Sequence, residues 1–238
     1  GFDGWESFTP NEDDIRAWFA TPGKAIGIRD GEGLDIDNKG CPSADELYAH
    51  WYATVDALAP GLADRLLMER TPSGGYHLAW DCEEIASSQK LATRPPTPAE
   101  LEASPALTFV TLIETKGRGG QFQVAPSPGY VLKRGDWRNR PHITPAERAI
   151  ILDCARSLTQ GSTRSAVKSR NGSTPAGERT GDRYNEQHAD EARALLLRAG
   201  WRSVYQRGDV EYLRRPGKTE GISATLGYVA PGVLYVFS

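Results

Sequence analysis

Apolar and polar residues alternate along the first two thirds of the chain in a way that predicts short strands and a few amphipathic helices. Thr9 and Thr144 stand where capping residues would begin the first and the last of these helices. Strands and helices follow one another without the regular spacing of strand–helix–strand units, so the pattern predicts an α+β fold of mixed α and β layers rather than a doubly wound sheet. The expected strands are 25–29, 33–37, 66–70, 76–80, 107–115 and 120–124, with a turn at Asp30-Gly31, and the expected helices are 9–20, 44–58, 99–103 and 144–158.

A segment with almost no apolar position interrupts this pattern. Residues 160–181 are rich in Ser, Thr, Gly and Arg, a composition typical of linkers. Helical spacing over 184–199 follows, and then strand patterns at 203–206, 210–213, 223–226 and 233–237. We therefore expect a first domain over 1–158, a flexible linker over 159–181 and a small α+β accessory unit over 182–238. Because the chain ends on an apolar strand, we expect it to be a fragment that leads into a further domain.

The composition is that of a globular domain with a real core. Of the 238 residues, 39% are hydrophobic and 25% are charged. No apolar run approaches the roughly 20 residues of a membrane span, so we expect no membrane partner. Three cysteines (Cys41, Cys82 and Cys154) lie far apart in the sequence. This odd number argues against a disulfide framework and a thiolate zinc site, and it indicates a cytoplasmic protein.

The net charge of −3 argues weakly against a nucleic-acid partner, but the charges are unevenly distributed. Residues 1–60 carry 4 basic and 12 acidic side chains, whereas residues 151–238 carry 13 basic and 9 acidic ones. An acidic first segment before a mildly basic remainder is compatible with a carboxylate metal site beside an anion-binding surface. It is equally compatible with scattered surface charge.

The first of three short motifs is Leu34-Asp35-Ile36-Asp37. Residues i and i+2 of a strand point to the same face, so the Asp35 and Asp37 carboxylates project together. Hard divalent cations prefer such oxygen ligands. The motif therefore predicts either a metal site or an ordinary exposed strand that carries acidic residues.

The second motif, Thr71-Pro72-Ser73-Gly74-Gly75-Tyr76-His77, lies between two expected strands. Small residues such as Gly74 and Gly75 let backbone amides approach an anion, and the Ser73 hydroxyl and the His77 imidazole add donors. Such a loop can hold a triphosphate. A hairpin turn with His77 packed in the sheet explains the same residues.

In the third motif, Glu114 ends an apolar strand and a glycine-rich basic loop follows it. Glu114 could complete a metal site, and Lys116 or Arg118 could contact phosphates. A glycine turn with solvated charges is the alternative. A basic run then follows at Lys133, Arg134, Trp137, Arg138 and Arg140. It combines positive charge with one stacking ring, as single-strand DNA binding requires, although a solvated loop is an equal alternative.

Taken in this order, the three motifs and the ending Val124-Ala125-Pro126-Ser127 resemble the archaeo-eukaryotic primase superfamily. The resemblance is to the primase-polymerase domains of phage and plasmid replication proteins and covers about residues 15–130. It implies a mixed-sheet catalytic core with RRM-like elements. The tail segments 177–182, 199–201, 215–218 and 223–225 resemble the region that precedes a helicase domain, which implies a helicase domain or protein downstream and, for a phage protein, the host cytoplasm.

The resemblance implies template-directed nucleotidyl transfer by a DNA primase/polymerase with two Mg²⁺ or Mn²⁺ ions. Asp35 and Asp37 match the paired metal-binding aspartates, and Glu114 stands where the third carboxylate is more often Asp. Ser73 and His77 match contacts to the phosphates of a dNTP or NTP. The catalytic set is then Asp35, Asp37, Glu114 and His77, with Gly74, Gly75, Lys116 and Arg118 also binding nucleotide. The basic run would contact the single-stranded template and the primer. The segment 94–105 departs from the family pattern as an unusual insertion.

Two other functions remain open from the residues. A non-catalytic module that binds single-stranded or origin DNA would keep the basic stretches and need no carboxylate trio. A metal-dependent nuclease or nucleotide hydrolase would use the same carboxylates to activate water. The presence of three carboxylates together with His77 favours the polymerase over the binding module.

Overall fold

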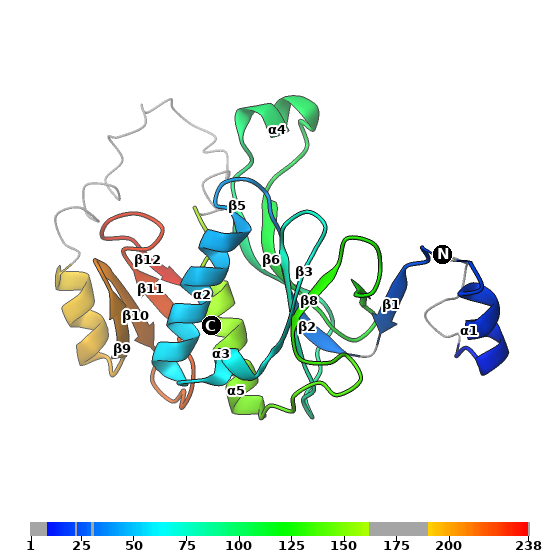
Figure 1. The fold of residues 1–238 in the computed structure, drawn as a ribbon. Coiled ribbons are helices and arrows are strands. Elements are labelled where there is room, and N and C mark those ends of the chain that lie inside the picture. Colours follow the sequence, from blue (N-terminus) through cyan, green and yellow to red (C-terminus); the bar gives the residue numbers. More distant parts are fainter. Residues whose placement is uncertain (1–8, 22, 30, 162–189, 238) are drawn as a thin grey trace.

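The computed structural model describes residues 9–21, 23–29, 31–161 and 190–237. Within these residues the chain forms three sheets and six helices, so the predicted α+β fold is confirmed. Figure 1 shows a central sheet, two long helices beside it and a smaller sheet beyond those helices. None of the described helices combines the length and the apolar character that crossing a bilayer requires.

The largest sheet has six strands in the order β5-β6-β2-β4-β3-β8, and every neighbouring pair is antiparallel, so this sheet is antiparallel rather than the mixed sheet that the resemblance implied. The central strand β2 therefore lies between the strands that carry the second and third motifs. The strands are β2 (Glu32–Ile36), β3 (Leu67–Arg70), β4 (Tyr76–Trp80), β5 (Gln89–Arg94), β6 (Val110–Lys116) and β8 (Val131–Arg134).

Two helices, α2 (Ala44–Leu58) and α5 (Pro145–Arg156), cover one face of this sheet, and the short helix α3 (Leu62–Arg65) follows α2. Leu34 and Ile36 of β2 are fully buried in the core beneath these helices. The indole Nε1 of Trp51 on α2 donates to the Ile151 carbonyl on α5 at 3.1 Å, which joins the two helices. Burial of alternate β2 residues on this side directs the residues between them to the opposite face.

A buried ion pair fixes β2 against α5. Glu32, which is 1% exposed, accepts hydrogen bonds from the Arg148 guanidinium, one of them at 2.6 Å, and from Trp80 Nε1 at 3.2 Å. A buried carboxylate is tolerated when its oxygens are paired in this way. The start of the Asp-x-Asp strand is therefore held in one position.

The structure corrects two sequence predictions at the N-terminal side. The helix α1 (Glu12–Trp18) is capped by Asn11 rather than Thr9, because the Asn11 side chain and the Asp14 side chain form a capping box. Strand β1 (Ile26–Arg29) pairs with β7 (Gln121–Val124) in a separate two-stranded sheet, not with β2 across a turn. The Ser127 hydroxyl holds this arrangement by accepting from the Ile26 amide at 2.7 Å.

Two strands of the large sheet were not predicted. Pairing between β5 and β6 is interrupted by register shifts, so β5 lacks a regular alternation. Strand β8 is an edge strand whose first three residues are exposed, so it has no apolar face to reveal it. The helix α4 (Pro98–Ala103) was predicted, and it lies in the segment that rises from the sheet at the top of Figure 1.

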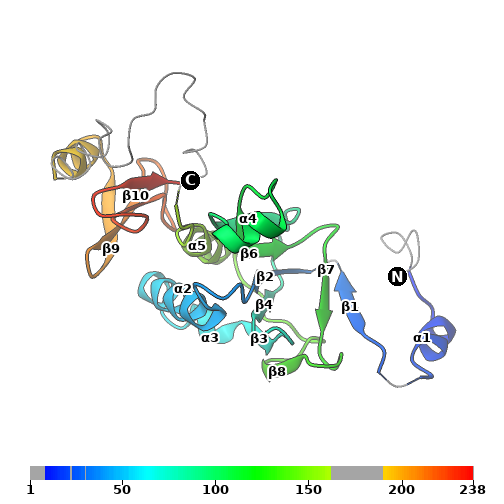
Figure 2. The same cartoon turned by 90° about the horizontal axis from the view of Figure 1, so that it is seen from above.

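The C-terminal unit contains a helix over 190–198 and a four-stranded sheet in the order β12-β11-β10-β9. Of the expected linker, residues 159–161 are described and the rest lies outside the described residues. The strands of this four-stranded sheet are β9 (Arg202–Arg207), β10 (Val210–Arg214), β11 (Ala224–Leu226) and β12 (Leu234–Val236). Figures 1 and 2 show this unit and α1 at opposite ends of the molecule, with α2 and α5 between the two larger sheets.

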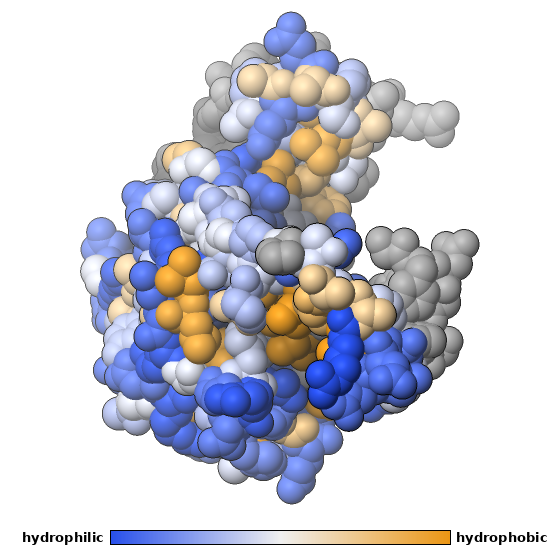
Figure 3. All heavy atoms as spheres, turned by 45° about the vertical axis from the view of Figure 1, so that its right-hand side comes forward, coloured by the Kyte–Doolittle hydropathy of each residue, from blue (hydrophilic) through white to orange (hydrophobic). Residues whose placement is uncertain are grey.

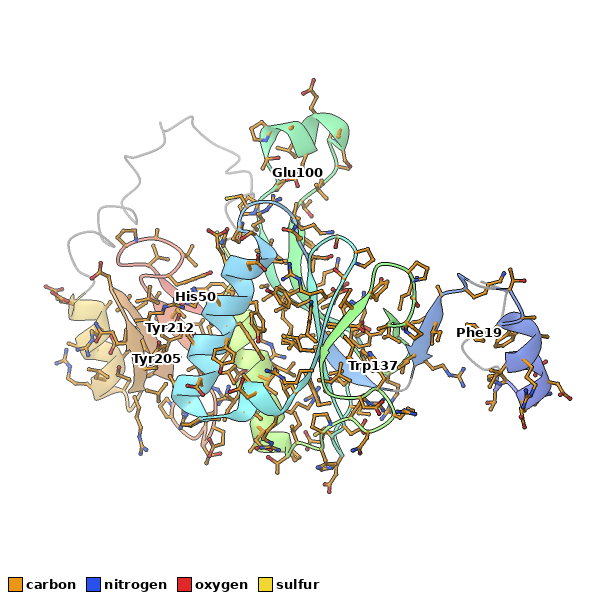
Figure 4. All side chains as sticks on the ribbon, viewed as in Figure 1. Phe19, His50, Glu100, Trp137, Tyr205 and Tyr212 are labelled. Carbon is orange, nitrogen blue, oxygen red and sulfur yellow. The ribbon has the colours of Figure 1, made fainter. Side chains whose placement is uncertain are left out.

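Polar contacts attach the C-terminal unit to α2 and α5. His50 Nε2 on α2 lies 2.7 Å from the Tyr212 hydroxyl on β10. Figure 4 labels both residues where the helix meets the C-terminal sheet. Lys218 Nζ donates to the buried Asp153 carboxylate of α5 at 2.7 Å. The C-terminal unit thus packs against α2 and α5. These contacts do not involve the face of the six-stranded sheet that lies opposite the two helices.

Protonation of His50 is expected to weaken this arrangement. Burial, together with a smaller contribution from the charge of Arg207, lowers the pKa of His50 to about 4. Because an unfolded histidine has a pKa of about 6.5, the unfolded chain binds a proton in this window that the folded chain does not. Stability should therefore fall as the pH drops from about 6.5 to about 4.

Thermal unfolding of the protein and of His50→Gln at several pH values measures this effect. The Gln amide can still bond the Tyr212 hydroxyl but does not titrate, so the unfolding temperature of the variant should fall less steeply with acid. Equal slopes for the two proteins would contradict the assignment.

Candidate active site

Charged side chains form a row across the six-stranded sheet. Asp35 on β2 lies directly opposite Glu114 on β6 and directly opposite His77 on β4. The row continues to Lys90 on β5 and to Glu69 on β3. Residues directly opposite one another in antiparallel strands project from the same face. This face is the one that α2 and α5 do not cover, because Leu34 and Ile36 point toward those helices.

The three predicted carboxylates lie close together on this face. Asp37 follows the end of β2, and its amide donates to the Leu112 carbonyl on β6 at 3.0 Å, which keeps it beside that strand. Burial raises the pKa of Asp37, and the Asp35 charge raises it further, while Lys39 lowers it and Glu114 adds a smaller upward contribution. The carboxylates therefore repel one another.

Lys116 supplies a cation to this group. Its ammonium donates to the Glu114 carboxylate. Burial lowers the pKa of Lys116, but this hydrogen bond and the charges of Glu114, Asp35 and Asp37 outweigh it and raise the pKa above its usual value. The predicted nucleotide-binding lysine thus neutralises part of the acidic cluster.

The donor chemistry of Asp35, Asp37 and Glu114 suits a hard divalent cation, which binds carboxylate oxygens. The mutual repulsion at Asp37 also favours a cation there. However, no three Asp, Glu, His or Cys side chains of the described chain converge on one cation position. Glu114 is engaged by Lys116, so it must leave that partner before it can join the two aspartates.

His77 lies between two carboxylates. Its Nδ1 is 2.8 Å from Glu69 Oε1, and its Nε2 is 3.5 Å from Asp35 Oδ1. Burial lowers the pKa of His77, but the hydrogen bonds to Asp35 and Glu69 and their charges raise it to about 9. The ring of Phe122 packs edge-on against the imidazole at 4.9 Å between centroids. Gly33 makes room for Phe122, because a Cβ on Gly33 would lie 2.9 Å from that ring.

Glu69 is a residue of the charged row that the sequence analysis missed. It is fully buried, and its second oxygen accepts from the Ala125 amide at 3.0 Å and from Trp137 Nε1 at 3.0 Å. One carboxylate therefore holds His77, the segment that follows β7 and the Trp137 loop. The signal in the sequence was an acidic residue at an inward position of a strand, Leu67-Met68-Glu69-Arg70.

Tyr130 is a second residue that the sequence analysis missed. Its ring centroid lies 5.7 Å from that of His77. Burial raises the pKa of Tyr130, and the charges of Asp35 and Glu69 raise it further. Tyr130 is therefore an aromatic neighbour of the charged row.

The second motif forms the predicted turn between β3 and β4, and the amides of its two glycines donate hydrogen bonds within that turn. The Gly74 amide donates to the Thr71 carbonyl at 2.9 Å, and the Gly75 amide donates to Thr71 Oγ1 at 2.9 Å. Gly74 has a φ of +84°, and a Cβ on Gly75 would lie 2.4 Å from the Ile36 carbonyl oxygen. Both glycines thus shape the turn, and their amides donate within it, so their predicted contact with phosphate stays a prediction, while Ser73 is exposed at the tip.

Some side chains of the predicted DNA-binding run make hydrogen bonds within the fold. The Arg134 guanidinium donates to the Leu66 and Ala63 carbonyls at 2.9 and 2.7 Å, so it anchors β8. Trp137 is half-buried beside the charged row, with its ring 6.2 Å from that of Phe122. Figure 4 shows Trp137 within the first domain, far from the C-terminal unit.

The other cations of this run lie nearer the surface. Arg138 pairs with Asp136 at 2.8 Å, and Arg140 pairs with Asp81 at 2.7 Å. Lys133 on β8 is exposed, as is Arg118 in the loop between β6 and β7. The described part of the run is therefore less cationic than its sequence suggests, since three of its arginines have internal or acidic partners.

Removal of the Glu69 carboxylate is expected to destabilise the fold. Glu69→Ala would leave the buried His77 imidazolium, the Ala125 amide and Trp137 Nε1 without this acceptor. Breaking one partner of a buried ionic network costs about 3 kcal/mol or more. Urea unfolding should show this loss, whereas Glu102→Ala on the exposed side of α4 should change stability by less than about 0.5 kcal/mol. A loss below about 1 kcal/mol for Glu69→Ala would contradict its structural role.

Comparison with known proteins identifies the first domain. The family model described as bifunctional DNA primase/polymerase, N-terminal, matches residues 1–149. Neither the curated proteins nor the solved structures contain a match to the chain. The matched range includes the whole charged row and leaves out the C-terminal unit. Since it spans more than half of the chain, the chain belongs to the bifunctional DNA primase/polymerase N-terminal domain family.

Proposed function

We propose that this protein is a template-directed DNA primase/polymerase that uses two Mg²⁺ or Mn²⁺ ions in the replication of phage or plasmid DNA. The observation that carries the proposal is the row in which Asp35 lies between Glu114 and His77. This order places oxygen ligands for cations directly beside a cationic side chain. A nucleoside triphosphate requires both, because its phosphates bind cations and charged donors.

Asp35, Asp37 and Glu114 would hold the two ions. In the reaction, the 3′-hydroxyl oxygen bonds to the α-phosphorus of the nucleotide, the bond from that phosphorus to the bridging oxygen breaks, pyrophosphate leaves and the hydroxyl proton passes to solvent. When bound, the ions supply activation of the hydroxyl and charge stabilisation of the leaving group. Glu114 becomes available for this role when it separates from Lys116.

His77 and Ser73 would bind the triphosphate. Glu69 holds the imidazole from its Nδ1 side, so the Nε2 side is directed toward Asp35 and the site. A protonated imidazole donates a charge-assisted hydrogen bond to a phosphate oxygen. Lys116 would exchange Glu114 for a phosphate, and Arg118, exposed on the adjoining loop, would add a further cation.

The proposed partners are the single-stranded template and primer, a dNTP or NTP, and a helicase domain or protein downstream, in the cytoplasm of the host. The exposed Lys133 and the surface arginine Arg138 are the residues of the basic run best placed for template phosphates. Because Arg134 holds β8 in place, we assign it a positioning role.

One observation favours a second candidate, a non-catalytic module that binds single-stranded or origin DNA. The Lys116–Glu114 pair occupies the third carboxylate, as expected if the site never binds metal. Incubation with a labelled primer, template and nucleotides separates the two functions. Extension of the primer supports the polymerase, and retention of DNA without extension supports the binding module.

The paired substitution Asp35→Asn with Asp37→Asn tests the metal assignment. We expect primer extension to fall at least about 100-fold, because charge stabilisation at such sites is worth several kcal/mol. Mn²⁺ binding measured by electron paramagnetic resonance should be lost as well, with the unfolding temperature retained. Asp209→Asn, at an exposed position of the C-terminal unit, is the matched control and should change neither. Extension at the unsubstituted rate would refute the assignment.

Substitution of the phosphate ligands should affect nucleotide more than DNA. A charge-assisted hydrogen bond is worth about 1.5–3 kcal/mol, so His77→Ala should raise the KM for nucleotide about 10-fold or more. The affinity for primed template should stay within about 2-fold. Ser73→Ala, at an exposed position, tests the same subsite without disturbing the fold and should raise the nucleotide KM to a smaller extent. An unchanged nucleotide KM in both variants would remove this turn from the site.

A further inference from the structure

An open cleft adjoins the charged row on the side away from His77. Its volume is about 530 Å³, and its lining includes Asp37, Lys39, Lys90 and Phe109. The cleft lies between the loop that follows β2 and the segment that carries α4. Figure 3 shows a face on which apolar patches stand among hydrophilic residues and which is hollowed below its uppermost segment.

Glu100, which lines this cleft, is held in place by a buried arginine. Arg94, which is 6% exposed, donates to both oxygens of Glu100 on α4 at 2.7 and 2.8 Å. The same guanidinium donates to the Lys39 carbonyl at 3.2 Å. A bidentate arginine–carboxylate pair fixes geometry as well as contributing energy. The α4 segment is thereby tied to the loop that carries Lys39, and Figure 4 shows Glu100 at that position.

The side chains of the cleft suit a nucleotide chain. Lys90 Nζ lies 4.6 Å from the centroid of the Phe109 ring. Lys39 Nζ lies 3.3 Å from Asp37 and is partly exposed, so it can turn to a phosphate. Ammonium groups for the backbone beside an aromatic ring for a base are the elements of single-strand binding.

The position of the cleft distinguishes its occupant from the incoming nucleotide. In the sheet, Lys90 on β5 lies directly opposite Glu114 on β6, and His77 on β4 lies directly opposite Asp35 on the other side of the row. Lys90 and His77 are thus three strand spacings apart, or about 14 Å at the usual spacing of about 4.8 Å. Nucleotidyl transfer joins two reactants, and the turn at Ser73 and His77 accounts for only one of them.

We infer that this cleft binds the 3′-terminal nucleotides of the primer strand, with Lys39 and Lys90 on its phosphates and Phe109 against a base. The inference rests on the proposed function, since it assigns the second reactant of that reaction. The terminal hydroxyl would then reach the carboxylates from the Glu114 side, opposite the triphosphate. The α4 segment, which departs from the family pattern, becomes the outer wall of the primer site.

The paired substitution Lys39→Gln with Lys90→Gln tests the inference by kinetics. At saturating nucleotide, the KM for primed template should rise about 10-fold, because each lost phosphate contact weakens binding in moderate salt. The KM for nucleotide should stay within about 2-fold. Lys24→Gln, an exposed lysine that precedes β1, is the matched control and should leave both constants unchanged. An unchanged primer KM in the double variant, or a rise confined to nucleotide, would overturn the inference.

Photo-crosslinking separates this inference from the proposed function. A primer that ends in 4-thiothymidine, annealed to its template, should crosslink to residues 106–111 in the absence of any nucleotide. Mass spectrometry of the peptides then locates the bond. Crosslinks confined to 131–140 or to 71–77 would overturn the primer assignment even if the protein extends primers. A crosslink at 106–111 in a protein that extends no primer would support the cleft and refute the polymerase.

Discussion

Electrostatic repulsion among carboxylates on one face of a sheet is the constraint on which the rest of this structure depends. Asp35, Asp37 and Glu114 lie near enough that each charge opposes the others. The fold balances them with cations that the same sheet provides, Lys116 on β6 and the His77 imidazolium on β4. Under the proposed function, each of these cations would bind a phosphate once a metal ion had taken its place beside the carboxylates.

Glu69 connects the charged row to other segments of the first domain through hydrogen bonds. A buried imidazolium beside Asp35 alone would be held on one side only, and Glu69 supplies the second partner at 2.8 Å. The other Glu69 oxygen binds the Ala125 amide and Trp137 Nε1, which belong to segments distant in sequence. The position of the imidazole, the path of the chain after β7 and the Trp137 ring are therefore parts of one network. Networks of this kind are stable only when every member is satisfied.

Local sequence pattern predicted those parts of the fold and site that depend on alternation. Leu34 and Ile36 are buried and Asp35 faces the other way, as the motif indicated. Pattern could not reveal Glu69, because a single acidic residue within a strand looks like a surface residue until its partners are placed. It also could not reveal β8, whose residues are largely exposed, or the engagement of the Gly74 and Gly75 amides within their own turn.

Topology also explains why net charge is a poor guide to the charges that one face of this sheet presents. The sum of −3 suggested little attraction for nucleic acid. Yet His77, Lys90 and Lys116 come from three different strands, and the strand order brings all three to one face. Arg134, by contrast, was predicted to bind DNA, but its guanidinium donates hydrogen bonds to backbone carbonyls within the fold. The charge that a polyanion would meet is therefore decided by register and strand order. Because phosphate binding depends on cations within a Debye length of roughly 10 Å, this local arrangement outweighs the total.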